Sequence, residues 1–157
     1  MQEIILLDEI KNGMKNKYTI METGEKRYRQ ICMKDKTAYI RAEGGNKGYW
    51  QNSHYHKYAK EIYIVQKGSI LLVQYINGKL YTNKINEDET FIVSQNVPHN
   101  VYMYPNTITH TVKYGKVESE DWESFKKLDE IIKEKNIDKK NRTNRNANKL
   151  IVCYLKL

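Results

Sequence analysis

Cysteine is scarce in this chain of 157 residues, and the only two, Cys32 and Cys153, stand far apart. They do not form the closely spaced framework of a disulfide-stabilised secreted domain, so a reducing cytoplasm is the expected location. The sequence also lacks the run of about 18 to 20 apolar residues that a transmembrane helix needs. The short apolar run at 4–7 ends at Asp8 and Glu9 and follows no basic segment, which argues against a signal peptide. We therefore expect a cytoplasmic protein with no membrane partner.

Acidic residues are fewer than basic ones, 19 against 27, and the positive excess is concentrated late in the chain. The formal net charge is +8, and the segment 133–149 alone holds seven basic and two acidic residues. Such a segment could bind an anionic partner, either nucleic acid or a phosphorylated ligand. We favour a solvated connector, because charge runs alone are weak signals and no helix-turn-helix pattern is visible. Nucleic acid is therefore not an expected partner.

The first two-thirds of the sequence predict β structure. Short apolar or alternating runs are separated by turn residues, a spacing typical of a sandwich or a barrel. The pair Asn77-Gly78 is the clearest turn, because both residues accept the positive φ angles of a two-residue hairpin. We expect one β domain over 1–116, with no internal repeat. The predicted strands are 17–21, 27–33, 37–42, 61–65, 70–76, 80–85, 91–93, 99–104 and 108–114.

The pattern then changes to a helical one. Apolar residues recur at spacings of three and four, and Ser119-Glu120-Asp121 offers an N-cap with acids in the first turn. This predicts one amphipathic helix over about 120–135, packed on the outside of the β domain. The region 117–157 would comprise this helix, the basic connector and an apolar terminal strand at 150–155. The apolar stripe consists of Trp122, Phe125, Leu128, Ile131 and Ile132.

Three of the four histidines and one glutamate suggest a metal site. His54 and His56 are two residues apart, so on a strand both imidazoles point to the same face. Glu61 begins the next apolar strand, where a lone buried carboxylate would cost several kcal/mol without a partner. His99 lies on a later strand, after Pro98. A metal ion shared by these side chains would compensate the buried charge, whereas a lone His-x-His on a surface strand would bind nothing.

The segment from Gly48 to Gly68 resembles the first motif of the cupin superfamily. That motif reads Gly, five residues, His-x-His, three or four residues, Glu, six residues and Gly, and every fixed position and spacing is present. The second cupin motif is Gly, five residues, Pro-x-Gly, two residues, His, three residues and Asn. Only its histidine, His99, survives here. The other positions hold Asp88, Ser94, Asn96 and Met103.

The resemblance implies a small double-stranded β-helix, a jelly-roll barrel, and a set of metal ligands. Carried over residue by residue, these ligands are His54, His56, Glu61 and His99. They would hold one divalent transition metal and leave room for water or substrate. Imidazole and carboxylate ligands suit Fe, Mn, Ni, Co or Zn and do not select among them.

His110 and Tyr63 are the candidate catalytic residues. His110 shares a strand face with Ile108, Val112 and Tyr114, so it is an acid/base candidate if that face is the barrel interior and a core histidine otherwise. Tyr63 shares a strand face with Glu61 and is the reserve candidate for the base. Tyr63 and Trp50 are also candidates for lining a pocket.

The resemblance allows three functions, because cupins host many. The first is a metal-dependent isomerase or epimerase of a sugar, a sugar phosphate or a nucleotide sugar. The second is a non-haem iron dioxygenase, and the third is a non-catalytic module that binds a small molecule or a metal. We expect a small-molecule ligand in each case, and a homodimer with an early or terminal strand in its interface.

Overall fold

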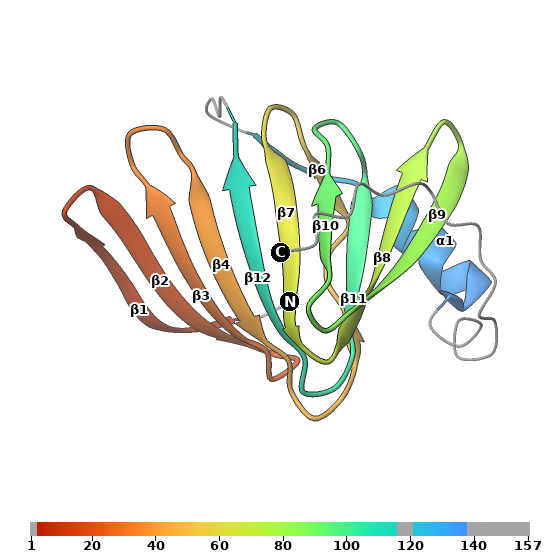
Figure 1. Ribbon diagram of the computed structural model, residues 1–157, viewed down its shortest axis with the longest axis horizontal. Helices are drawn as coiled ribbons and strands as arrows, with labels where there is room; N and C mark the ends of the chain where they lie inside the picture. Colours follow the sequence, from red (N-terminus) through yellow and green to blue (C-terminus); the bar gives the residue numbers. More distant parts are fainter. Residues whose placement is uncertain (1–2, 116–120, 138–157) are drawn as a thin grey trace.

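Residues 3–115 and 121–137 are described by the computed structural model, and their strands form two antiparallel sheets around one interior (Figure 1). The elements are β1 Glu3–Lys11, β2 Met14–Met21, β3 Lys26–Cys32, β4 Ala38–Glu43, β5 Tyr49–Trp50, β6 His54–His56, β7 Lys60–Lys67, β8 Ser69–Ile76, β9 Lys79–Asn86, β10 Thr90–Val93, β11 His99–Met103, β12 Ile108–Tyr114, β13 Trp122–Ser124 and α1 Lys126–Lys135. The larger sheet has the order β1-β2-β3-β4-β12-β7-β10. The smaller sheet has the order β13-β6-β11-β8-β9, and β5 pairs with β11. The predicted all-β jelly-roll barrel with one helix is confirmed.

All nine predicted strands are present, with ends that differ by up to three residues. Strands β1, β5, β6 and β13 are additional. The four apolar residues at 4–7 follow one another without alternation, so the pattern did not predict β1 as a strand.

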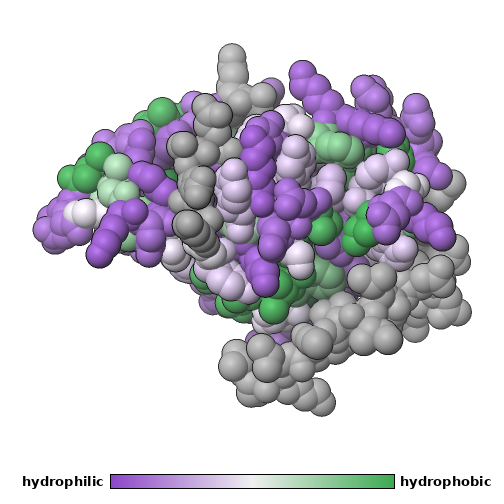
Figure 2. Space-filling model, turned by 90° about the horizontal axis from the view of Figure 1, so that it is seen from above, coloured by the Kyte–Doolittle hydropathy of each residue, from purple (hydrophilic) through white to green (hydrophobic). Residues whose placement is uncertain are grey.

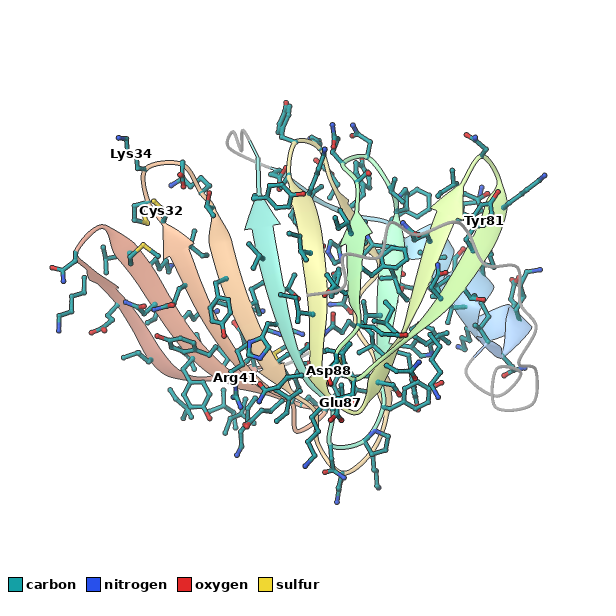
Figure 3. The ribbon with its side chains drawn as sticks, viewed as in Figure 1. Cys32, Lys34, Arg41, Tyr81, Glu87 and Asp88 are labelled. Carbon is teal, nitrogen blue, oxygen red and sulfur yellow. The ribbon has the colours of Figure 1, made fainter. Side chains whose placement is uncertain are left out.

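Residues with positive φ angles occupy the turn predicted at Asn77-Gly78 and three glycine positions of the two cupin motifs. Asn77 and Gly78 have φ angles of 50° and 76°, as the β8–β9 hairpin requires. Gly68 has a φ angle of 78°, and a Cβ there would lie 2.7 Å from Oγ1 of Thr107. Asp88 and Asn96 occupy glycine positions of the second cupin motif and have φ angles of 64° and 59° (Asp88 is labelled in Figure 3). The left-handed geometry of these turns is therefore retained without glycine.

The central part of β8, from Ile70 to Val73, is wholly apolar because both faces of the strand are buried there. Ile70 and Leu72 point into the barrel, where they join the core between the sheets. Leu71 and Val73 point outward and pack under α1. The helix contributes Leu128 and Ile132 to this second core, so the predicted packing of the helix on the outside of the β domain is confirmed.

The predicted start of the helix is wrong. Its first residue is Lys126, and Phe125 stands at the N-cap without a side-chain hydrogen bond to the helix. Trp122 and its neighbours instead form β13, which pairs with β6. Asp121 is buried and is bonded to groups near β6 rather than to the helix N-terminus. The competing partner was a histidine 65 residues away, which a local pattern cannot reveal.

Strand β1 is the outer strand of the larger sheet, and its apolar side chains are exposed. Ile4 and Ile10 are 64% and 63% exposed, and hydrophobic atoms are visible at this end in Figure 2. No helix among the described residues is long and apolar enough to cross a membrane. Most of the basic segment 133–149 and the predicted strand 150–155 lie outside the described residues.

Candidate metal centre

Three strands bring the four candidate ligands together inside the barrel. His54 and His56 are on β6 of the smaller sheet, and His99 on β11 is paired directly with His54. Glu61 enters from β7 of the larger sheet and is 5% exposed. The site therefore lies where the two sheets face each other.

Each imidazole directs its Nε2 atom toward the carboxylate of Glu61. The Nε2 of His99 lies 3.0 Å from Oε2, and that of His54 lies 3.9 Å from the same oxygen. The Nε2 of His56 lies 3.2 Å from Oε1. Donor atoms of His54, Glu61 and His99 all lie within 4.8 Å of one another, so this group could hold a metal ion.

The opposite nitrogen of each ring is held by an oxygen acceptor. Nδ1 of His54 lies 2.9 Å from the carbonyl oxygen of Asn52, and Nδ1 of His99 lies 2.9 Å from that of Val97. Nδ1 of His56 lies 2.6 Å from Oδ2 of Asp121. These acceptors place the ring proton on Nδ1 and leave the Nε2 lone pair free for a metal.

This donor set fits a cation. With protons on all three Nδ1 atoms, lone pairs of imidazole nitrogen face the Glu61 carboxylate across 3.0–3.9 Å. Such contacts repel unless a metal ion or extra protons lie between the atoms. Nitrogen and carboxylate ligands with ordered outer partners are typical of transition-metal sites.

The pKa values of these groups reflect both their burial and their close contacts with one another. Burial alone would raise the pKa of Glu61, but its contacts with His54, His56 and His99 hold it well below its ordinary value. Burial alone would lower the pKa of His56, but its contacts with Glu61 and Asp121 raise it. Burial lowers the pKa of His54.

Tyr63 is at the site, but its environment favours a donor rather than a base. Its hydroxyl lies 3.0 Å from Oε2 of Glu61 and 3.3 Å from Nε2 of His99. Burial and the neighbouring carboxylate raise the pKa of Tyr63 well above its ordinary value. The hydroxyl therefore keeps its proton and donates it in a hydrogen bond to Glu61.

His110 and Trp50 are not where a pocket role would require them. His110 is on the outer face of β12, where its Nδ1 lies 2.8 Å from the Tyr39 hydroxyl and its Nε2 2.6 Å from Oε1 of Gln66. The residues of β12 that line the cavity are Thr109, Thr111 and Lys113. His110 therefore does not reach the metal centre. Trp50 packs against the core beneath α1 instead.

Two aspartates that sequence reasoning did not assign to the site support it from β13 and α1. Asp121 binds His56, and its Oδ1 also accepts the backbone N–H groups of Tyr58 and Ala59. Oδ1 of Asp129 accepts hydrogen bonds from Ser53, at 2.5 Å from its hydroxyl, and from Asn100, at 3.0 Å.

Asp129 thus secures both metal-bearing strands, because Ser53 precedes His54 and Asn100 follows His99. Neither aspartate carried a local sequence signal for this role.

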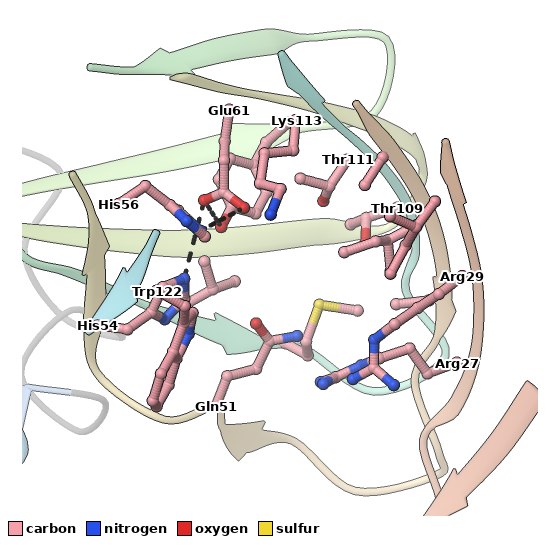
Figure 4. A pocket seen from close by; sticks show the side chains of 17 residues that line it. Arg27, Arg29, Gln51, His54, His56, Glu61, Thr109, Thr111, Lys113 and Trp122 are labelled. Carbon is pink, nitrogen blue, oxygen red and sulfur yellow. Dashed lines mark hydrogen bonds and ion pairs between the residues drawn. The ribbon is translucent and has the colours of Figure 1, made fainter. Parts of the chain in front are cut away.

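A cavity of about 260 Å³ opens beside the ligands (Figure 4). Trp122 is half exposed at this cavity and stacks on His54, with ring centroids 5.6 Å apart. Lys113 lines the same space, and its Nζ lies 3.7 Å from Oδ2 of Asp121. The polar side chains at the cavity that Figure 4 labels are Arg27, Arg29, Gln51, His54, His56, Glu61, Thr109, Thr111 and Lys113.

No protein-family model and no curated protein sequence matches this chain. Solved structures do match it. Oxalate decarboxylase from Bacillus subtilis, a protein with Mn(II) centres, aligns with 94% of this chain at 14% identity and a TM-score of 0.58. Vicilin from hazelnut (Corylus avellana) aligns with 76% at 8% identity and 0.56, and a recombinant oxalate oxidase in complex with glycolate aligns with 66% at 18% identity and 0.52.

This chain covers 40%, 35% and 56% of those three structures, respectively. At such identities the likeness concerns the fold, and all three are built from cupin barrels. The two sheets, the left-handed turns and the converging histidines agree with it. The protein therefore has the cupin fold that its first histidine motif predicts.

Proposed function

We propose that this protein is a metal-dependent cupin that binds one divalent transition metal through His54, His56, Glu61 and His99 and acts on a small polar molecule. One observation carries the proposal: three imidazoles turn their Nε2 atoms toward a single buried carboxylate while an acceptor holds each Nδ1. A His-x-His pair on a surface strand would have neither a third converging imidazole nor an oxygen acceptor at each Nδ1 atom.

The proposed reaction is isomerisation or epimerisation of a carbohydrate-like substrate. When bound, the metal would supply a Lewis acid that polarises a carbonyl group. Such a reaction also needs a group that moves a proton. Lys113 replaces His110 in this proposal, because its side chain lines the cavity and His110 does not.

Trp122 supports a sugar-like ligand. Its indole is 50% exposed yet lies against His54 at the cavity, so its free surface is available to a ligand. The apolar face of a sugar ring can pack on such an aromatic surface while its hydroxyls bind polar neighbours.

Metal analysis tests the ligand assignment. We expect close to one transition metal per chain, and a lower melting temperature after chelation, because the metal stabilises only the folded state. His54→Ala and Glu61→Gln should abolish most of this shift. His110→Ala is the matched control, since it removes a histidine outside the site and should retain the metal. Full metal loading in the His54→Ala/Glu61→Gln double variant would refute the assignment.

Paired anaerobic and aerobic assays with iron- and zinc-loaded protein test the reaction. Incorporation of solvent deuterium into a sugar without oxygen, lost in Lys113→Gln, supports the isomerase. Oxygen uptake with substrate that occurs only with iron identifies a dioxygenase instead. Ligand binding without turnover under every condition identifies a binding module.

A further inference from the structure

Two arginines extend the polar site away from the metal ligands. Arg27 and Arg29 are neighbours on the inner face of β3, and both line the cavity that holds His54, His56 and Glu61. Figure 4 shows them across the cavity from Glu61. The metal centre itself does not use them.

The strands between these two ends carry small side chains. The register places Arg29 in one row with Ile40, Thr111 and Tyr63, and Arg27 in the next row with Ala42 and Thr109. Strand β7, which carries Glu61, is three strands away from β3, or roughly 14 Å along the sheet. Apart from Ile40, the residues of β4 and β12 in these two rows are alanine and threonine, so most of this interval is open. The open space is therefore built into the sheet, between a metal end and an arginine end.

The guanidinium groups have donors to spare. Nε of Arg27 lies 2.6 Å from Oε1 of buried Glu25, and Nη1 of Arg29 lies 3.8 Å from Oε2 of Glu3. Each guanidinium has five N–H donors, so these contacts occupy only a fraction of them. Burial, and then the charge of Arg27, lower the pKa of Arg29 to about 10, as expected for a cation with incomplete compensation.

Lys113 adds a third cation to the lining, and Glu61 is the one carboxylate among the cavity residues described. Glu25, Glu3 and Asp121 lie beside the three cations. If a divalent metal occupies the centre, the positive charges still exceed those of Glu61 and these three acids by one, so the cavity is net positive. Such a space favours an anionic ligand.

We propose that Arg27 and Arg29 form a subsite for an oxyanion, a phosphate or carboxylate group of the substrate, whose opposite polar end reaches the metal. This deepens the proposed function and rests on it. Planar guanidinium groups bind such oxyanions with paired, charge-assisted hydrogen bonds. A second cavity of about 250 Å³, lined by Met21 and Asn52 as well as both arginines, leaves room for a larger substituent beyond the anion.

Calorimetric titration of the zinc-loaded protein with inorganic phosphate, and separately with succinate, tests this subsite. We expect Arg27→Gln and Arg29→Gln to weaken binding of the favoured anion about tenfold or more, because each removes charged hydrogen bonds. Arg29→Lys, which keeps the charge and loses the planar fork, should fall between. Stronger binding of phosphate or of succinate tells which oxyanion the subsite prefers.

Arg41→Gln is the matched control. Arg41, labelled in Figure 3, is on β4, paired with Glu43 and absent from the cavity lining. Unchanged anion affinity in both pocket variants, or no binding of either anion to the wild-type protein, would overturn the subsite. Zinc content is measured on the same samples. Its loss from the wild-type protein would refute the metal proposal, whereas lost anion binding with full zinc content is attributable to the arginines.

Discussion

Asp121→Asn is a selective perturbation of the metal centre, because it preserves shape and changes only what Oδ2 contacts, the ring of His56 and the ammonium of Lys113. In the wild-type protein Oδ2 of Asp121 accepts from Nδ1 of His56 at 2.6 Å, and Oδ1 accepts two backbone N–H groups. Asparagine can keep the two backbone contacts with its oxygen. Its NH₂ group then faces Nδ1 and favours the ring proton on Nε2, where it blocks the metal.

The expected loss follows from the role of such outer partners. Removing one typically lowers metal affinity 10- to 100-fold. At a free metal concentration of 100 times the wild-type Kd, binding stabilises the wild-type protein by about 2.7 kcal/mol. The variant would retain only about 1.4 kcal/mol after a tenfold loss, or about 0.4 kcal/mol after a hundredfold loss.

Competition with a chromophoric chelator measures the affinity, and thermal unfolding with and without metal measures the stabilisation. Glu123→Gln is the control, because Glu123 is an acid two residues further along the chain, on β13, and its partner is the partly exposed Lys57. We expect wild-type metal affinity for it. If Asp121→Asn binds metal as tightly as the wild-type protein, then Asp121 does not orient His56 as a ligand.

Three further predictions follow from other contacts. Tyr63→Phe removes the hydroxyl that contacts Glu61, so metal affinity measured by chelator competition should fall severalfold with the fold retained; an unchanged value would contradict a positioning role for this hydroxyl. Leu128→Ala should lower the free energy of unfolding in urea by about 2–5 kcal/mol, because this side chain is fully buried between α1 and the smaller sheet; a loss below 1 kcal/mol would be inconsistent with that packing. If exposed β1 forms the predicted homodimer interface, light scattering after size exclusion should find a dimer that Ile4→Glu and Ile10→Glu together convert to a monomer; a wild-type monomer at micromolar concentration would rule the interface out.

The convergence of His54, Glu61 and His99 and most of the strands were predictable, because the motif and the alternation that indicate them are local. The first cupin motif sets His54, His56 and Glu61 at fixed spacings on and between strands, and alternation with turn residues marks the strands themselves. The left-handed turns at Asn77 and Asn96 follow from the residue types that tolerate positive φ.

The face of β12 that points inward could not be predicted from alternation. Ile108, His110 and Val112 make the more apolar face, which ordinarily packs inside. This barrel instead encloses a polar cavity, so Thr109 and Thr111 line it and the apolar face turns outward. For the same reason, alternation alone does not predict that Arg27 and Arg29 on β3 point into the cavity.

The contacts of Asp121 and Asp129 with the site could not be predicted from the local sequence, for a different reason. An acid ahead of an apolar stripe ordinarily caps a helix, as the sequence around Asp121 suggests. Whether it binds a helix end or an imidazole depends on the pairing of β13 with β6, and no local pattern in the sequence indicates that pairing.

The dependence of the histidines on Asp121 and Asp129 also sets an order for maturation during synthesis. The strands that carry His54 and His99 leave the ribosome before the two acids that orient them. In the proposed metal site, the imidazoles would not yet be fixed when these strands first emerge and would bind a metal weakly. Tight binding would require β13 and α1 to dock, so the last described elements of the chain would decide when the ion is bound.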